Sequence, residues 1–215
     1  MLGPILFINP NSSEEVTQGI AEALGPFAPA WPSGFESVCL PDGPATIATD
    51  LHVAEAATSL ARLLQDRPDA AAYVVACFSD TGVEVMRSLT SRPVIGLQQT
   101  GILAALSRAD LFRIIALSDK SRGRHRLRMC QSGVMSRFVA SLDLGGASAE
   151  DVGHCADTFD KSCEAGRALV RMGAEAIVLG CASFAPQRPR IEEAIGVPVI
   201  DPVAAAAGLA RAACL

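Results

Sequence analysis

Ala72-Tyr-Val-Val-Ala-Cys77-Phe-Ser79 and Ala176-Ile-Val-Leu-Gly-Cys181-Ala-Ser183 are two versions of one pattern, an apolar run that ends in Cys-x-Ser. Nearly continuous apolar runs of this length are typical of parallel strands that helices cover on both faces. The spacing from Cys77 to Cys181 is 104 positions. We interpret the two stretches as the central strands of two repeated units, each with a cysteine where the strand ends.

A second pair of matching stretches supports the repeat. Arg92-Pro-Val-Ile-Gly96 and Val197-Pro-Val-Ile-Asp201 follow the two cysteines and are 105 positions apart. Ile5-Leu-Phe-Ile8 and Ile114-Ile-Ala-Leu117 are candidates for the opening strands of the two halves. The repeat predicts two similar α/β lobes that face each other across a cleft, at the strand ends where ligands bind in open α/β sheets.

Around the repeat, β-branched runs alternate with amphipathic stretches, which predicts parallel sheets with right-handed crossovers. The expected strands cover residues 4–8, 36–40, 72–77, 94–96, 112–117, 175–180 and 197–200. The expected helices cover residues 13–24, 46–66, 80–89, 99–107, 121–133, 148–172, 187–194 and 202–213. The first lobe is expected to comprise residues 1–96 with the C-terminal segment 201–215, and the second lobe residues 97–200.

The composition limits the class of protein. A chain of 215 residues, half of them hydrophobic, is long enough for one domain or two small lobes with buried sheets. The net charge of −5 argues against a nucleic-acid-binding surface, which needs clustered excess Lys and Arg. One basic run, Arg122-Gly-Arg-His-Arg-Leu-Arg128, is interpreted as the solvated face of a helix start, with an anion site or a subunit contact left open.

The sequence also predicts a reduced, soluble protein of the cytoplasm. Residues 1–9 lack a basic segment and a cleavage site, and no apolar run approaches the ~18–20 residues of a membrane span. The seven cysteines are irregularly spaced, so free thiols are expected rather than disulfides. There is no C-x-x-C pair, and His154-Cys155 with Cys163 lacks zinc-ligand spacing, so no metal is expected.

Cys77 and Cys181 stand where a strand ends and a helix is about to begin, with Asp80 or Ser79, and Ser183, as candidate helix caps. A thiol at a helix N-terminus faces backbone N–H groups and the positive end of the helix dipole. Both lower its pKa below the free value of about 8.5. The other cysteines are interpreted as inert packing residues: Cys39, Cys130, Cys155, Cys163 and Cys214.

Two thiols that face each other across a cleft suit the inversion of a stereocentre with an acidic C–H. One thiolate removes the proton, and the other thiol returns a proton from the opposite face. Pyridoxal phosphate would need a Schiff-base lysine, and neither Lys120 nor Lys161 lies in a phosphate-binding context. We therefore expect no cofactor: the substrate's own carbonyl takes the charge, and N–H donors at the helix starts stabilise it.

Other motifs have little support. The sequence has no G-x-G-x-x-G after the first strand, no Walker loop and no G-x-S-x-G elbow. His52, His125 and His154 lie at no evident strand end. A catalytic Cys–His pair, as in some proteases, is left open as an alternative. Asn9-Pro-Asn-Ser-Ser13 is either a turn with a helix cap or a lining of the cleft mouth, and Ser118 is its counterpart in the second half.

Four stretches spread over the whole chain carry a family resemblance: Ile8-Asn-Pro-Asn-Ser-Ser13, Val75-Ala-Cys-Phe-Ser-Asp-Thr-Gly82, Val178-Leu-Gly-Cys-Ala-Ser183 and Val197-Pro-Val-Ile-Asp201. In this order they resemble the aspartate/glutamate/hydantoin racemase superfamily, and its hydantoin and allantoin racemase branch most closely. The resemblance implies an α/β fold of two pseudo-symmetric flavodoxin-like lobes with parallel sheets and an active-site cleft between them. It also implies cofactor-independent catalysis by a cysteine pair that matches Cys77 and Cys181.

The chain departs from that branch around both cysteines. The branch has Cys-Phe-Gly-Asp-Pro-Gly where this chain has Ser79 and Thr81, and Ala-Gly-Met where it has Ala182-Ser-Phe184. Phe78-Ser79 also differs from the Asn-Thr of the amino-acid racemases. A 5-substituted hydantoin or allantoin is the favoured substrate. Maleate-type cis–trans isomerisation, aspartate or glutamate racemisation and a non-enzymatic ligand-binding domain stay open as alternatives.

A neutral cyclic ureide needs amide and hydroxyl partners rather than charged ones, and the cysteine motifs contain neither Arg nor Lys. The expected substrate-binding residues flank the cysteines or close the opening strands: Asn11, Ser79, Asp80, Ser118, Ala182 and Ser183. The expected partners are a small-molecule substrate and further copies of the chain in a homo-oligomer. The Ala-rich helix 202–213 is a candidate subunit contact, and neither nucleic acid nor membrane is expected.

Overall fold

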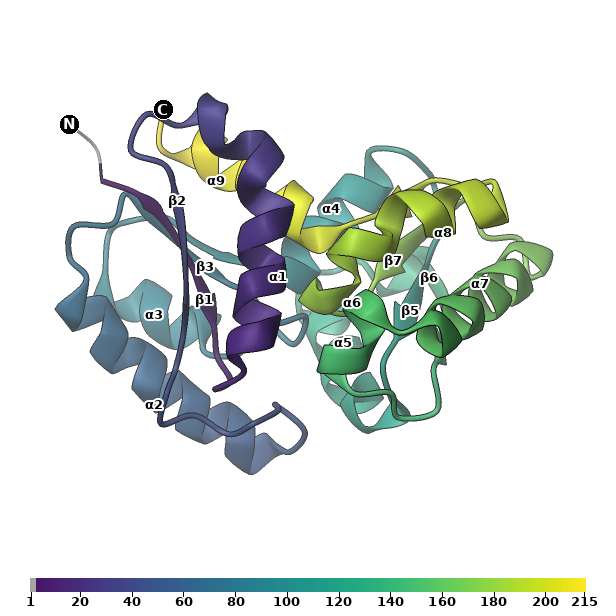
Figure 1. Ribbon diagram of the computed structural model, residues 1–215, viewed down its shortest axis with the longest axis horizontal. Helices are drawn as coiled ribbons and strands as arrows, with labels where there is room; N and C mark the ends of the chain where they lie inside the picture. The colour runs from purple at the N-terminus through teal and green to yellow at the C-terminus, as the bar shows by residue number, and fades with distance from the viewer. Residues whose placement is uncertain (1–2) are drawn as a thin grey trace.

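The computed structural model describes residues 3–215. It contains two parallel four-stranded sheets, each flanked by helices, which form two lobes lying side by side (Figure 1). The first sheet has the strand order β2-β1-β3-β4, and the second has the order β6-β5-β7-β8. The same order in both sheets confirms the two-lobed α/β fold that the sequence repeat predicts.

The strands are β1 (Ile5–Asn9), β2 (Phe35–Cys39), β3 (Ala72–Val75), β4 (Val94–Gly96), β5 (Phe112–Ala116), β6 (Phe138–Asp143), β7 (Ala176–Leu179) and β8 (Val199–Ile200). The α-helices are α1 (Glu14–Leu24), α2 (Asp50–Asp66), α3 (Val83–Leu89), α4 (Leu97–Leu106), α5 (Arg122–Gln131), α6 (Ala149–His154), α7 (Ala156–Arg171), α8 (Arg188–Ile195) and α9 (Pro202–Ala213). Short 3₁₀ helices are η1 (Gly25–Ala30), η2 (Asp119–Ser121), η3 (Met135–Arg137) and η4 (Ala182–Gln187).

The two cysteine-bearing strands occupy equivalent places in the two sheets. β3 pairs with β1, with Ala72 opposite Ile5, and β7 pairs with β5, with Ala176 opposite Phe112. Every residue of these four strands is buried, as the apolar runs predict. Because parallel strands end at the same edge of a sheet, the segments that carry the two cysteines leave corresponding edges of the two lobes.

Each lobe is completed by a helix that follows a strand of the other lobe. α4 follows β4, yet it buries Ile102 against Ile114 and Val178 of the second sheet. α9 follows β8, yet it packs on the first sheet against Ile5 and Val74. Figure 1 shows α9, in yellow, beside α1 and the first sheet. The residues of α9 buried there are Val203, Ala206, Ala207 and Ala210.

On this packing we propose that the lobe boundaries lie near residues 96 and 201. Residues 1–2, which the sequence assigns to the first lobe, lie outside the described residues. The apolar face of α9 is buried within its own chain, so that face is not free to contact a second subunit as the sequence suggested. A homo-oligomer stays a prediction.

Two segments differ from their expected secondary structure. Residues 138–143 lie outside the expected strands and helices, but they form the edge strand β6, whose residues are half-buried around an exposed Val139. An edge strand covered on one side lacks the continuous apolar run that reveals a central strand. The expected helix 148–172 is two helices, because Cys155 has an extended backbone (φ −79°, ψ 131°) that ends α6 and begins α7.

Candidate active site

A cavity of about 460 Å³ lies between the lobes at the ends of the central strands. The first lobe contributes residues 9–11 after β1, the loop 45–48 and residues 76–79 after β3. The second lobe contributes residues from the segments 117–125, 146–150 and 180–182. Six of the eight expected site residues line this cavity: Cys77, Cys181, Asn11, Ser79, Ser118 and Ala182.

The two thiols have related but unequal surroundings. The Thr81 hydroxyl lies 3.6 Å from Cys77 Sγ and donates to it. The Cys181 thiol lies 3.5 Å from Ser183 Oγ and donates to it. Cys181 is the residue immediately before η4, and the backbone N–H groups of Ala182 and Ser183 also face its sulfur. Ser183 therefore acts on the thiol rather than on the cavity, whose lining does not include it.

The expected lowering of the thiol pKa values is wrong. Burial is the largest effect and raises the pKa of both Cys77 and Cys181, although the neighbouring N–H groups and hydroxyls lower it. A negative charge on Cys181 raises the pKa of Cys77 further. In addition, α3 begins only at Val83, six residues after Cys77, so no helix start faces that sulfur directly. Both thiols are therefore protonated at neutral pH, and ionisation of one opposes ionisation of the other.

Asp80 does not line the cavity and instead stabilises the fold. Its backbone is in the left-handed region (φ 48°). Its carboxylate accepts hydrogen bonds from the backbone N–H groups of Gln98 (2.7 Å) and Gln99 (3.0 Å), which caps α4. The sequence predicted a cap on helix 80–89 instead. Burial raises the pKa of Asp80 to about 7, so the carboxylate takes up a proton near neutral pH.

The cap of α4 distinguishes the two halves of the repeat. In the second lobe Asp201 follows β8 and caps α9 through the N–H groups of Val203 (2.8 Å) and Ala204 (3.4 Å). The first lobe has Gly96 at the matching place, and a Cβ there would overlap the Asp80 carboxylate. Asp80 thus replaces the missing cap and ties the turn after Cys77 to α4.

We expect Gly96→Ala to destabilise the protein by about 1–3 kcal/mol, because the added Cβ displaces the buried Asp80 carboxylate. Gly123→Ala is the matched control. Gly123 lies in α5 with no atom near the place of a Cβ, so the better helix propensity of Ala should stabilise by up to about 1 kcal/mol. Urea unfolding of both variants measures the difference. A neutral Gly96→Ala would show that the Asp80 cap does not hold this turn.

The Asn-Pro-Asn turn after β1 is held by its own side chains. Asn9 Nδ2 donates to Asn11 Oδ1 (2.7 Å) and to Thr17 Oγ1 (3.1 Å). Asn11 Oδ1 also accepts from the backbone N–H of Ser13 (2.9 Å), and Ser13 Oγ caps α1. Both interpretations of this motif are therefore correct, since the segment caps a helix and also lines the cavity.

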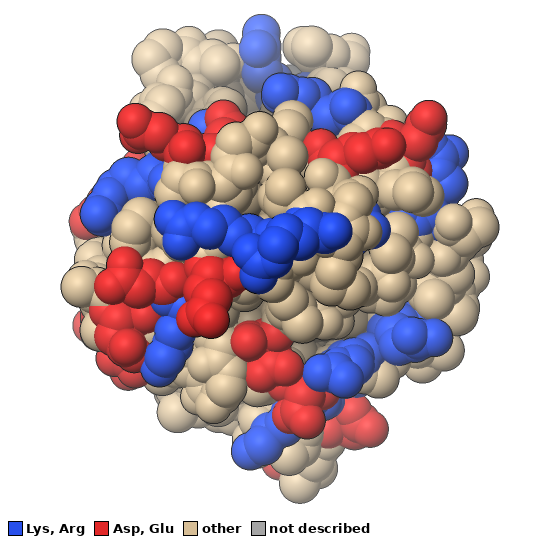
Figure 2. Space-filling model, turned by 90° about the vertical axis from the view of Figure 1, so that its right-hand side faces the viewer, with Lys and Arg blue, Asp and Glu red and all other residues tan. Residues whose placement is uncertain are grey.

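The basic run supplies cavity residues that the sequence analysis missed. Arg124 and His125 line the cavity, together with Lys120 just before the run, whereas Arg122 and Arg126 are exposed. The expectation of a site without cationic side chains is therefore wrong. On the outer end of the second lobe, Figure 2 shows basic and acidic side chains alternating in short bands.

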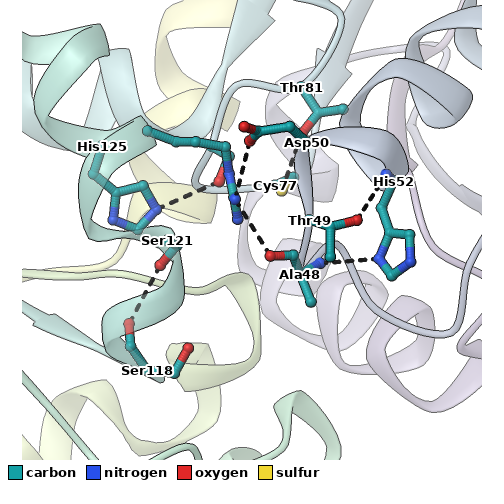
Figure 3. A network of polar contacts seen from close by, with 11 residues as sticks. Ala48, Thr49, Asp50, His52, Cys77, Thr81, Ser118, Ser121 and His125 are labelled. Carbon is teal, nitrogen blue, oxygen red and sulfur yellow. Dashed lines mark hydrogen bonds and ion pairs between the residues drawn. The ribbon is translucent and has the colours of Figure 1, made fainter.

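His125 forms part of the cavity wall next to the first cysteine segment. Its Nε2 lies 3.4 Å from Ser79 Oγ, and its ring meets the Phe78 ring edge-on at 5.1 Å between centroids. Burial lowers the pKa of His125 to about 4, so the imidazole is neutral at physiological pH. Figure 3 shows His125, Ser121 and Ser118 together, and Ala48, Thr49 and Asp50 at the start of α2 in the other lobe.

Residues 3–215 also bear on the expectations about disulfides, metal sites and membrane spans. All seven cysteines lie within them and carry free thiols. Among residues 3–215, no group of three or more His, Cys, Asp or Glu side chains is placed to hold a metal ion. No helix in this part of the chain is long and apolar enough to cross a membrane.

Comparisons with known proteins agree with this architecture. The profile of the Asp/Glu/Hydantoin racemase family matches residues 5–210. A hydantoin racemase of Paenarthrobacter aurescens is 33% identical over 216 residues, which cover 96% of this chain and 89% of that protein. The structure of an allantoin racemase from Klebsiella pneumoniae has a TM-score of 0.87 at 27% identity and covers 98% of this chain and 86% of its own. An allantoin racemase from Pseudomonas fluorescens shares the fold at a TM-score of 0.85 and 23% identity, over 97% and 89% of the two chains.

Fold, cavity and relatives together define the class of protein: the chain is an isomerase of the racemase type, built from two α/β lobes. A ligand-binding domain without activity, one of the alternatives left open by the sequence, is thereby set aside. The chain belongs to the Asp/Glu/hydantoin racemase family.

Proposed function

We propose that the protein racemises a 5-substituted hydantoin or allantoin, with Cys77 and Cys181 as acid and base on opposite faces of the reacting carbon. The observation that carries the proposal is the placement of the two thiols. They follow equivalent central strands of two similar lobes, and both line one cavity between those lobes. A relative named hydantoin racemase and a structural neighbour named allantoin racemase support this class of substrate.

The proposed reaction uses one proton transfer on each face. The thiolate of one cysteine removes the proton from C5, and the electron pair passes to the adjacent carbonyl oxygen as an enolate. The thiol of the other cysteine then protonates C5 from the opposite face. For either direction one cysteine must be ionised and the other protonated. The mutual opposition of their ionisation favours this mixed state over the state with two thiolates.

The groups around the thiols stabilise the ionised base and offer polar partners to a neutral ring. Backbone N–H groups of Ser79 at Cys77, and of Ala182 and Ser183 at Cys181, face the sulfurs and stabilise the thiolate that acts as the base. Hydrogen bonds to the charged form of a group favour that form, so these donors offset part of the pKa increase that burial causes. Asn11 and Ser118 add an amide and a hydroxyl to the cavity lining for the ureide groups.

A panel of enantiopure substrates tests the assignment. Hydantoins with different C5 groups, allantoin, aspartate, glutamate and maleate are incubated with the purified protein, and loss of optical rotation or isomerisation is followed against enzyme-free controls. We expect inversion of at least one hydantoin or of allantoin. Turnover of maleate alone, or of the free amino acids alone, would replace the proposal with the corresponding isomerase. The homo-oligomer and the cytoplasmic location also stay predictions, and light scattering of the purified chain tests the first.

A further inference from the structure

Arg124 is an incompletely paired cation at the border of the cavity. It lies in the first turn of α5, and its Nη1 is 3.3 Å from both the Ala48 carbonyl oxygen and Asp50 Oδ1 of the first lobe. Both distances are at the long end of the hydrogen-bond range. Its Nε and Nη2 are shielded from solvent and have no hydrogen-bond partner among residues 3–215. Figure 3 shows the Ala48 and Asp50 oxygens with the contacts they accept.

This arrangement leaves most of the guanidinium's binding capacity unused. A buried donor without a partner destabilises the folded protein, and a charged donor does so more than a neutral one. The planar edge formed by Nε and Nη2 matches the two oxygens of a carboxylate, which it binds in a bidentate manner. Both atoms are shielded from solvent, so the guanidinium must turn to present this edge to the cavity, and only the two long contacts of Nη1 hold it back. Asp50 does not fill this role, because its side chain is 88% exposed and reaches only Nη1.

Lys120 is a second cation at the border of the cavity. Lys120 lines the same cavity and forms no ion pair within residues 3–215. Among the described residues that line the cavity, Glu150 is the acidic one. Its Oε1 accepts a hydrogen bond from Ser13 Oγ at 3.0 Å. Lys120 and Arg124 also line an outer groove of about 820 Å³ that adjoins the cavity. The groove is also lined by Asp50 and Glu84, which form ion pairs with Arg124 and Arg128, so Lys120 is the cation in its described lining without an ion pair.

We propose that Arg124, assisted by Lys120, binds a carboxylate on the C5 substituent of the substrate. The ligand class is an acidic 5-(carboxyalkyl)hydantoin or a related ureide acid, whose ring lies between the thiols and whose acidic arm points to the outer groove. The inference rests on the proposed function and narrows it. A neutral C5 group would leave Nε and Nη2 of Arg124 without partners, whereas a carboxylate satisfies both once the guanidinium has turned toward the cavity.

Two substrates of nearly equal shape test the proposal: 5-carboxymethylhydantoin, which is an anion at neutral pH, and 5-carbamoylmethylhydantoin, which is neutral. The measured quantity is the ratio of their kcat/KM values, followed by circular dichroism. We expect the wild-type protein to prefer the acid by at least about 10-fold. Arg124→Met should lower that ratio by about 10- to 100-fold, the range of a lost charged hydrogen bond. Arg126→Met, an exposed position on the same helix, removes an equal charge and should keep the wild-type ratio.

Both kcat/KM values are measured on the same protein, so a general loss of activity in a variant cancels in their ratio. The ratio of the wild-type protein tests the proposal without any variant. A wild-type ratio near one would overturn the proposal. So would a ratio retained in Arg124→Met, since equal losses on both substrates would assign Arg124 to the reacting ring instead. Inversion of alkylhydantoins or allantoin without the acid would overturn the inference and leave the proposed function standing. Inversion of no ureide at all would remove both.

Discussion

Replacing Cys77 or Cys181 with serine is expected to lower the rate of racemisation by about 10²–10⁴-fold or more, because each thiol supplies one of the two proton transfers. Serine keeps the shape of the side chain but is a far weaker acid, and its hydroxyl is scarcely ionised near neutral pH. The rate of inversion of a hydantoin or of allantoin, followed by polarimetry, measures the loss. Cys130→Ser is the control, because Cys130 is exposed and does not line the cavity.

Deuterium exchange separates the roles of the two thiols. In D₂O each variant keeps one base, so it should exchange the C5 proton of the enantiomer that faces the surviving cysteine without inverting it. Cys77→Ser and Cys181→Ser should then prefer opposite enantiomers. Exchange of the same enantiomer by both variants would contradict opposed faces. Undiminished racemisation by either variant would rule out the two-cysteine mechanism.

The pH dependence of kcat/KM should be steep. Burial raises the pKa of both thiols above the ordinary value of about 8.5, so the thiolate needed as base is scarce at neutral pH. Below its pKa, the ionised fraction of a thiol grows tenfold for each pH unit. We therefore expect kcat/KM to rise by about 100-fold between pH 6 and pH 8, without a plateau.

The profile is measured as initial rates of inversion, with the enzyme-free rate subtracted at each pH. Far-ultraviolet circular dichroism at both ends of the range is the control for an intact fold. A plateau below pH 8 would mean that one thiol has a lowered pKa, as the position of a thiol near a helix start suggested from the sequence. The proposed chemistry would then survive, but burial would not be the dominant effect on that thiol.

The parts of the fold that the sequence predicts well are those with a local signal. The apolar runs that end at Cys77 and Cys181 identify the central strands, and their repeat predicts the two lobes. The edge strand β6 lacks such a run because one of its sides faces solvent. Cys155 interrupts the expected helix 148–172 with no proline or glycine at that position to reveal the break.

The missed features of the site depend on contacts between distant segments. Arg124 and His125 belong to a run with exposed neighbours, and only the packing of α5 beside the first lobe turns these two residues toward the cavity. Asp80 follows the first cysteine closely, but its partners lie on α4, 18 and 19 positions further along the chain. The raised thiol pKa values likewise arise from burial that both lobes create together.

The exchange of helices between the lobes has a consequence for the order in which the chain folds during translation. The second lobe has its complete set of strands, and α4 to cover its sheet, once residue 200 has left the ribosome. The first lobe is synthesised earlier, but one face of its sheet is covered by α1 without α9 until α9 emerges. Although domains usually fold from the N-terminus onward during synthesis, here the later lobe is finished first. The nascent first lobe therefore lacks the part of the cover over Ile5, Phe7 and Val74 that α9 supplies until the end of translation.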